Sequence, residues 1–199
     1  MHVTRVWAKD QPFGAELANL TVSGGSLSAT GVAIGSEPCP YRLDYQLTTT
    51  EGYVTAQLIV RTEGPGWRRA LVLDRAISGT WSCVTEAEGS LDRPAPGGDL
   101  SPLAGALDCD LGLSPLTNSM PVLRHRLHER GGPEDFRMAW VAVPELAVYP
   151  SRQRYAFVRR EGQTRVVRFE ALDGDFVADI AFDDQGVVLD YPGIARLAA

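Results

Sequence analysis

The fold class is set by residues 41–48, which read Tyr41-Arg42-Leu43-Asp44-Tyr45-Gln46-Leu47-Thr48. Apolar and polar side chains alternate strictly along this stretch. A period of two is typical of a β-strand with one buried face and one wetted face. The same alternation recurs in three further runs, whose shared faces carry Val54, Ala56, Leu58 and Val60; Phe136, Met138 and Trp140; and Phe176, Ala178, Ile180 and Phe182. Strands that are half buried favour an antiparallel sheet.

Glycine-containing turns separate these runs at short spacing. They are Ser23-Gly24-Gly25, Glu51-Gly52, Ser78-Gly79, Glu161-Gly162, Asp173-Gly174 and Asp184-Gln185-Gly186. Glycine supplies the positive φ that tight hairpins require. The repeated order of strand, turn and strand predicts an antiparallel meander. Parallel βαβ units are not expected, because the pattern lacks the crossover helices that parallel strands need.

Residues 114–129 break the alternation and predict one helix, chiefly over residues 119–129. Its apolar face carries Leu116, Met120, Leu123 and Leu127. Asn118 or Ser119 can cap the helix, and the following Pro121 is tolerated in a first turn. The glycines and proline of residues 131–133 are expected to end it.

We therefore expect a mainly β fold, in which one large antiparallel sheet is wrapped around a single α-helix within one domain over residues 1–199. Rolling the sheet deals with its exposed edges. Residues 92–102 are rich in proline and glycine. We expect them to form a loop inside the domain, because strand patterning continues on both sides. The basic side chains of the helix should lie at an open mouth or a wet side; they are Arg124, His125, Arg126 and His128.

The composition excludes several classes of protein. A net charge of -6 argues against a nucleic-acid partner, because binding phosphates requires a positive surface. The three cysteines form no C-x-x-C pair, so neither a disulfide framework nor a structural zinc site is expected. Cys109 shares a strand face with Leu107 and Leu111 and should be a core thiol. Residues 1–10 lack a signal-peptide pattern, and no apolar run approaches the roughly 18–20 residues of a membrane span. We expect a soluble cytoplasmic protein without membrane insertion.

The chain also lacks the motifs of common catalytic and cofactor sites. It has no nucleophile elbow, phosphate loop or dinucleotide fingerprint, so we expect no cofactor and assign no catalytic residue. His125 and His128 lie one helical turn apart, but with Glu129 they match no zinc motif, and no metal site is predicted. Asp108 and Asp110 share a strand face, where like charge can raise one pKa and create an acid/base pair. Pairing with arginines is the alternative for both carboxylates.

Aromatic rings on strands beside arginines and carboxylates offer a different chemistry. Flat rings stack on sugars or line acyl cavities, while forked donors and carboxylate acceptors hold polar head groups. The predicted ligand-binding residues are Trp67, Arg69, Asp108, Asp110, Trp140, Arg154 and Tyr155. Core packing and strand-face ion pairing are the alternative roles for each.

Six blocks of sequence together resemble one bacterial family. They are residues 40–45, 66–69, 105–124, 139–144, 153–155 and 190–193. The chain resembles the "putative glycolipid-binding" family, formerly a domain of unknown function, over nearly its whole length. The resemblance implies a spiral β-roll, with a many-stranded antiparallel sheet around one helix, that forms homodimers. It implies no catalytic residue.

Three functional hypotheses follow. The first is a non-enzymatic protein that holds a glycolipid or other amphipathic molecule in its curved sheet. The second is a hydrolase or other enzyme that uses Asp108 and Asp110 at the mouth of the roll. The third is a cytoplasmic dimer with a filled core and no small ligand. An internal cavity would favour the binding protein. A perturbed carboxylate pair in a polar cleft would favour the enzyme, and a filled roll would favour the dimer without a small ligand.

Overall fold

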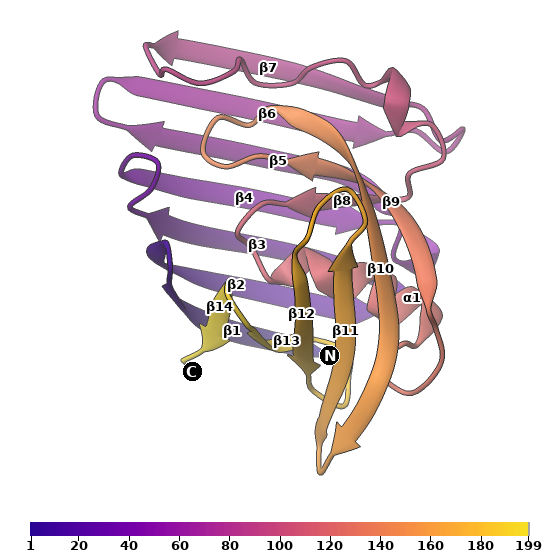
Figure 1. Cartoon of the computed structure of the whole chain (residues 1–199). Helices are drawn as coiled ribbons and strands as arrows, with labels where there is room; N and C mark the ends of the chain where they lie inside the picture. Colours follow the sequence, from indigo (N-terminus) through magenta and orange to yellow (C-terminus); the bar gives the residue numbers. More distant parts are fainter. Residues whose placement is uncertain (199) are drawn as a thin grey trace.

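A computed structural model describes residues 1–198 of the chain. Its strands form one sheet of 14 strands, in the order β7-β6-β5-β4-β3-β2-β1-β14-β13-β12-β11-β10-β9-β8 (Figure 1). The strands are β1 (His2–Asp10), β2 (Phe13–Ser23), β3 (Ser26–Gly35), β4 (Tyr41–Thr49), β5 (Thr55–Gly64), β6 (Trp67–Arg75), β7 (Trp81–Gly89), β8 (Asp108–Leu111), β9 (Glu134–Val141), β10 (Val148–Glu161), β11 (Thr164–Ala171), β12 (Val177–Phe182), β13 (Val188–Tyr191) and β14 (Ala195–Leu197). The helices are α1 (Ser119–His125) and the 3-10 turns η1 (Glu51–Tyr53), η2 (Ser101–Leu103) and η3 (Leu116–Asn118). The predicted fold class, a mainly β roll with a helix at its centre, is confirmed.

The sheet has two halves that meet at the short strand β14. The long-strand half consists of β1–β7, and each of these strands is antiparallel to the next along the chain. The curled half consists of β8–β13 together with α1. β14 pairs with β1 on one side and with β13 on the other. In Figure 1 the strands β9–β12 run steeply across the strands of the long-strand half.

The inner face of the long-strand half follows the predicted alternation. Its β4 contributes four buried side chains, Tyr41, Leu43, Tyr45 and Leu47. On β5, Leu58 and Val60 are buried as predicted, but Ala56 is only half-buried, as is Val54, which precedes the strand. The register shifts where β4 meets the start of β5, and Thr55 takes the buried position instead.

Two tyrosine rings on β4 lie against glycines of β3. A Cβ atom at Gly31 would lie 2.3 Å from the ring of Tyr45, and one at Gly35 would lie 2.4 Å from the ring of Tyr41. Because only hydrogen fits in this space, close packing in mid-strand fixes Gly31 as glycine.

Helix α1 is shorter than predicted. It ends because Arg126 adopts a left-handed conformation with φ 54°, several residues before the glycines of residues 131–133. The amide of Arg126 donates to the carbonyl of Leu123 at 3.3 Å, and the amide of Leu127 donates to the carbonyl of Val122 at 2.9 Å. This is a Schellman cap, in which the residue after the turn packs back on the last helical turn. Both Leu127 and Val122 belong to the same buried cluster.

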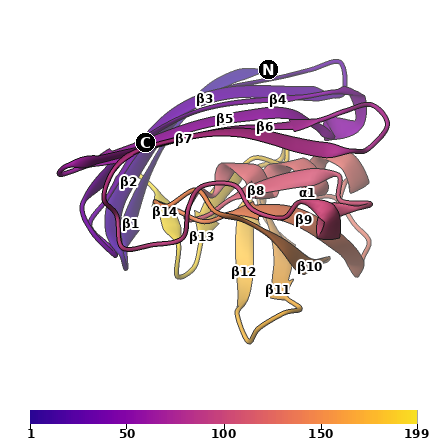
Figure 2. The same ribbon diagram turned by 90° about the horizontal axis from the view of Figure 1, so that it is seen from above.

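The first five residues of α1 are buried, whereas its last residue, His125, is exposed. Met120 and Leu123 belong to the larger buried cluster, which joins the inner face of the long-strand half to residues of β8 and β9, whereas Val122 and Leu127 pack into the core of the curled half. The helix therefore packs against both halves of the sheet. Figure 2 shows the long-strand half arching over α1, with β10–β12 on its other side. We predicted that the basic side chains of the helix would face solvent. This prediction is wrong for His128, which is buried.

The prediction that parallel βαβ units are absent is wrong at one place. β8 and β9 pair in parallel, with Asp108 opposite Met138 and Leu111 opposite Val141. The segment between these strands, which contains α1, is the crossover that a parallel pair requires. The α-helix at the centre of the roll therefore also belongs to the crossover that lets β8 and β9 run in the same direction.

The two edges of the sheet differ. At β8 the backbone is covered, because the amide of Cys109 donates to Thr55 Oγ1 at 2.8 Å and the amide of Leu111 donates to Thr117 Oγ1 at 3.3 Å. At the opposite end, β7 has a strand neighbour on one side.

Within residues 1–198 no helix is long and apolar enough to cross a membrane.

Candidate functional site

A cleft of about 510 Å³ opens on the curled half. Its walls come from β8, the loop that follows β8, β9, β10, β11, the turn after β11, and β13. Five aromatic side chains line it, namely Trp140, Tyr149, Phe169, Phe176 and Tyr191. Its polar side chains are Asp110, Ser114, Asn118, Ser151, Gln153 and Asp173. This volume lies within the range of small-molecule sites, which combine apolar walls with a few placed polar groups.

The aromatic residues form two groups. Trp140 of β9 and Tyr149 of β10 are cross-strand partners, and their ring centroids are 5.8 Å apart. Both keep a large exposed fraction, 37% for Trp140 and 40% for Tyr149. Phe169 forms the second group with Phe176 and Tyr191, at centroid distances of 5.9 and 5.8 Å. Trp140, Tyr149 and Phe176 are exposed and present flat apolar surfaces to a ligand, whereas Phe169 and Tyr191 are buried behind Phe176.

Asp110 carries the charge at the floor of the cleft. Thr117 Oγ1 donates to its Oδ1 at 3.0 Å, and Gln153 Nε2 donates to its Oδ2 at 2.6 Å. Burial raises the pKa of the Asp110 carboxyl, and these two hydrogen bonds act in the opposite direction. The side chain is half-buried, so part of its surface faces the cleft.

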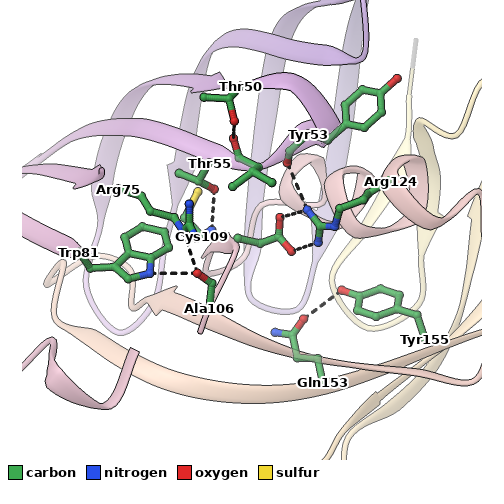
Figure 3. A network of polar contacts seen from close by, with 12 residues as sticks. Thr50, Tyr53, Thr55, Arg75, Trp81, Ala106, Cys109, Arg124, Gln153 and Tyr155 are labelled. Atoms are coloured by element: carbon green, nitrogen blue, oxygen red, sulfur yellow. Dashed lines mark hydrogen bonds and ion pairs between the residues drawn. The ribbon is translucent and has the colours of Figure 1, made fainter. Parts of the chain in front are cut away.

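A second layer of polar groups holds Gln153 in place. The Tyr155 hydroxyl lies 2.7 Å from Asn118 Oδ1 and 3.0 Å from Gln153 Oε1, and it can donate to either (Figure 3). Tyr155 and Asn118 are buried, and burial raises the pKa of the Tyr155 phenol far above its ordinary value. Because the phenol stays protonated, its donor function fixes the orientation of the Gln153 amide, whose Nε2 then points to Asp110.

The loop that lines the cleft is also anchored to the long-strand half. Ser114 Oγ donates to Glu16 Oε1 at 2.6 Å, and the Tyr45 hydroxyl donates to the same oxygen at 2.9 Å. The other oxygen, Glu16 Oε2, lies 3.3 Å from Lys9 Nζ. Glu16 and Lys9 are both buried, and this ion pair ties the back of the cleft to β1 and β2.

Comparisons with known proteins identify the family and support the fold. The family model described as "Putative glycolipid-binding" matches residues 4–197. The chain belongs to this family. It is also similar to the crystal structure at 1.80 Å resolution of a DUF1089 family protein from Pseudomonas aeruginosa, with 27% sequence identity, 91% of each chain covered and a TM-score of 0.66. No curated protein matches the chain.

In this member of the glycolipid-binding family, three of the predicted ligand-binding residues lie together. Asp110 and Trp140 line the cleft, and they are neighbours across β8 and β9. Tyr155 lies behind the floor and reaches the cleft through Gln153. Its role is to position the amide, since the ring itself is buried.

Asp108 lies outside the cleft and forms an ion pair. Arg124 Nη1 donates to Asp108 Oδ1 at 2.8 Å, and Nη2 makes a short hydrogen bond to Oδ2 (Figure 3). Arg124 also donates to the carbonyl of Tyr53 at 3.4 Å, which links α1 to η1. Burial raises the pKa of the Asp108 carboxyl, although the Arg124 guanidinium acts against this rise. The two carboxylates of β8 therefore do not share one cavity.

The remaining three predicted residues lie elsewhere. Trp67 packs over Gly64 in the core of the long-strand half, where a Cβ at Gly64 would lie 2.6 Å from the indole. Arg69 is 7% exposed, and its Nη1 donates to two backbone carbonyls at 3.1 Å each. Arg154 pairs with Asp135 at 2.6 Å. None of the three is among the described residues that line the cleft.

A larger groove, of about 930 Å³, lies at one end of β3–β7 and includes Trp67 and Tyr41. Its other walls are the glycine and proline turns at the strand ends and exposed charged side chains. Because Trp67 and Tyr41 are themselves buried, the groove offers a ligand little aromatic surface. The cleft of the curled half is the better candidate site for this reason.

Several residues of the cleft were not predicted from the sequence. The most important are Gln153, Asn118 and Ser114, which supply the polar floor or anchor it. A signal for all three was present, since Asn118 and Ser114 lie in the family block of residues 105–124 and Gln153 lies in the block of residues 153–155. The cysteine prediction is confirmed, because Cys109 is buried and burial raises its pKa to about 12. Among the described residues no group of three or more His, Cys, Asp or Glu side chains is arranged to hold a metal ion.

Proposed function

We propose that this protein binds an amphipathic molecule of the glycolipid type without transforming it. The head group occupies the cleft of the curled half, against the Asp110–Gln153 floor. Its apolar part lies along the exposed ring of Phe176, which packs against the buried rings of Phe169 and Tyr191. The observation that carries the proposal is the combination of exposed aromatic walls with a polar floor that is already held in place.

The position of Asp108 argues against the acid/base pair that was predicted on β8. In such a pair both carboxylates would face one substrate. Asp108 is committed to Arg124 and lies outside the cleft, so the carboxylate pair of β8 presents Asp110 alone to a ligand. Membership of the family supports the same choice of ligand class.

A panel of alkyl glycosides and fatty acids, each below its micelle concentration, tests the proposal. A ligand that binds the folded state alone raises the melting temperature by mass action. We expect octyl β-glucoside to raise it and Trp140→Ala to weaken the affinity by about tenfold, since the stacking surface is lost. Ile77→Ala is the matched control, because Ile77 is 99% exposed and lies outside the cleft. If no compound shifts the melting temperature, and native mass spectrometry of protein from its own host shows no retained lipid, the proposal is wrong.

We also propose that the protein is a homodimer. β7 is the edge of the sheet that lacks a strand on one side, and pairing of exposed edges by a twofold axis is a common solution. Sedimentation at micromolar concentration should give twice the mass of the chain. A mass of one chain at that concentration contradicts this part of the proposal.

A cytoplasmic location completes the proposal. Cys39, Cys83 and Cys109 are all free thiols, which suits a reducing compartment. Fractionation of cells that produce the full chain with a C-terminal tag tests this location. Recovery in the membrane or extracytoplasmic fraction would contradict it.

A further inference from the structure

We infer that the cleft selects an uncharged, hydroxyl-bearing head group and rejects anionic ones. This inference rests on the proposed function and narrows its ligand class. It follows from the charges that line the cleft and from the direction of the hydrogen bonds that its floor can still make. A glycoside head group satisfies both conditions, whereas a phosphate or carboxylate head group satisfies neither.

The ionisable charges at the cleft are all acidic. Asp110 and Asp173 line it, and the described lining residues include no lysine, arginine or histidine. Arg124 and Arg154 are already paired, with Asp108 and Asp135 respectively. An anionic head group would therefore meet like charge without a cation to compensate it. Like charges brought together at a partly buried site are strongly unfavourable.

The hydrogen-bonding capacity of the floor leads to the same conclusion. The Gln153 amide nitrogen donates to Asp110 at 2.6 Å and to Ser151 Oγ at 3.4 Å, so its two protons are used. Each oxygen of Asp110 accepts one hydrogen bond, and a carboxylate can accept about four. The spare capacity of the Asp110 and Gln153 side chains is therefore acceptor capacity. Sugar hydroxyls can donate to it, whereas an ionised phosphate or carboxylate has no proton to donate.

Two ligands that differ at one carbon provide the test. Octyl β-glucoside carries a CH2OH group where octyl β-glucuronide carries a carboxylate, and ring and alkyl chain are the same. Isothermal titration at pH 7 with the wild-type full chain should give a glucoside affinity at least about tenfold higher than that of the glucuronide. In Asp110→Asn the ratio should fall toward one, because the charge is lost while the shape is kept.

Two further variants separate a local effect from the net charge of the protein. Asp173→Asn removes the second cleft carboxylate. In combination with Asp110→Asn it should bring the ratio of glucoside affinity to glucuronide affinity still closer to one. Asp44→Asn removes one charge from the exposed outer face of β4 and should leave the ratio unchanged. If the wild-type protein binds both ligands equally, or prefers the glucuronide, the inference is wrong while the proposed function stands. If it binds neither, the inference is wrong, and the melting-temperature panel together with native mass spectrometry decides whether the proposed function fails as well.

Discussion

The long-strand half and the curled half belong to one sheet but are built differently. Strands β1–β7 have 9 to 11 residues each, and they follow one another as antiparallel neighbours. Strands β8–β13 vary from 4 to 14 residues and include one parallel pair. Their ladders shift register within β10 and β12, and the long-strand half has one such shift, at the end of β4. Such irregularities bend a strand and increase its twist, which lets the curled half close around α1.

The comparison also concerns where polar side chains are buried. In the long-strand half the inner face is mostly apolar, and its buried Glu16 is directed toward the cleft loop at Ser114. In the curled half, Asp108, Asp110 and Gln153 are tied to partners on α1, η3 and β8. Buried polar groups are tolerated when every one has a partner, and they then fix one arrangement. The regular half therefore acts as a frame, and the irregular half carries the site.

The largest effect is expected from breaking the ion pair that holds α1 in the curled half. Arg124→Met leaves the Asp108 carboxylate buried without a cation, and we expect a loss of about 4 kcal/mol in the free energy of unfolding at neutral pH. Urea denaturation measures this loss. Asp108→Asn in the same chain should recover at least about half of it, because the uncompensated charge is then gone.

The pH dependence of this variant gives a second measurement. Burial raises the pKa of Asp108 in the folded protein above its unfolded value, and Arg124 opposes that rise. A folded-state pKa that is raised means that the folded protein keeps the proton as pH increases while the unfolded chain loses it, so stability falls with rising pH. Removing Arg124 strengthens this trend. The deficit of Arg124→Met relative to wild type should thus be larger at pH 8 than at pH 5, and a deficit that is independent of pH would contradict the assignment.

The same substitution in both halves sharpens the comparison. Trp7 is fully buried in the core of the long-strand half, and Trp7→Ala should cost about 3 kcal/mol in unfolding free energy because it leaves a large cavity. Trp140 is 37% exposed at the cleft, so Trp140→Ala should cost less than about 1 kcal/mol. Ligand-induced stabilisation should show the opposite order, with Trp7→Ala retaining it and Trp140→Ala losing most of it. Equal unfolding costs would contradict the division into frame and site.

The difference between the halves also explains what could be predicted from the sequence. Strict alternation at Tyr41, Leu43, Tyr45 and Leu47 correctly predicted the buried face of the long-strand half. The parallel pairing of β8 was missed, because this strand has only 4 residues and its alternation is too short to indicate direction. The end of α1 was placed too late, since Arg126 carries no sequence signal for the left-handed conformation that it adopts.

For the site, the sequence indicated which types of side chain could bind a ligand, but it did not indicate which side chains form hydrogen bonds with one another. Asp110 and Trp140 were predicted because a carboxylate and an indole on strands are recognisable by type. Gln153 was missed because its importance depends on Asp110, which is 43 residues away in the chain. Trp67 and Arg69 have the same chemistry as the residues of the cleft, but they lie in the other half. Only the fold distinguishes the two sets.

A smaller effect is expected at the close contact between β3 and β4. Gly31→Ala places a Cβ atom 2.3 Å from the ring of Tyr45, and we expect a loss of about 2 kcal/mol as the ring is displaced. Gly174→Ala is the control, since a Cβ there meets nothing within 4 Å. Thermal denaturation should show a lower melting temperature for Gly31→Ala. The melting temperature of Gly174→Ala should equal that of the wild type within error. A Gly31→Ala protein with wild-type stability would mean that the Tyr45 ring is free to move.

The smallest effect is expected at Arg154, which belongs to the curled half but lies outside the cleft. Its partners Asp135 and Glu170 are exposed to solvent, where salt screens ion pairs and their net contribution is small. Arg154→Ala should therefore change neither the melting temperature in physiological salt nor the melting shift produced by octyl β-glucoside. Gln153→Ala alters the neighbouring residue on β10, whose side chain reaches the floor, and should abolish most of that shift. If Arg154→Ala weakened the shift as much as Gln153→Ala does, the ligand would extend beyond the cleft to the outer face of β10, and the site would have to be enlarged to include it.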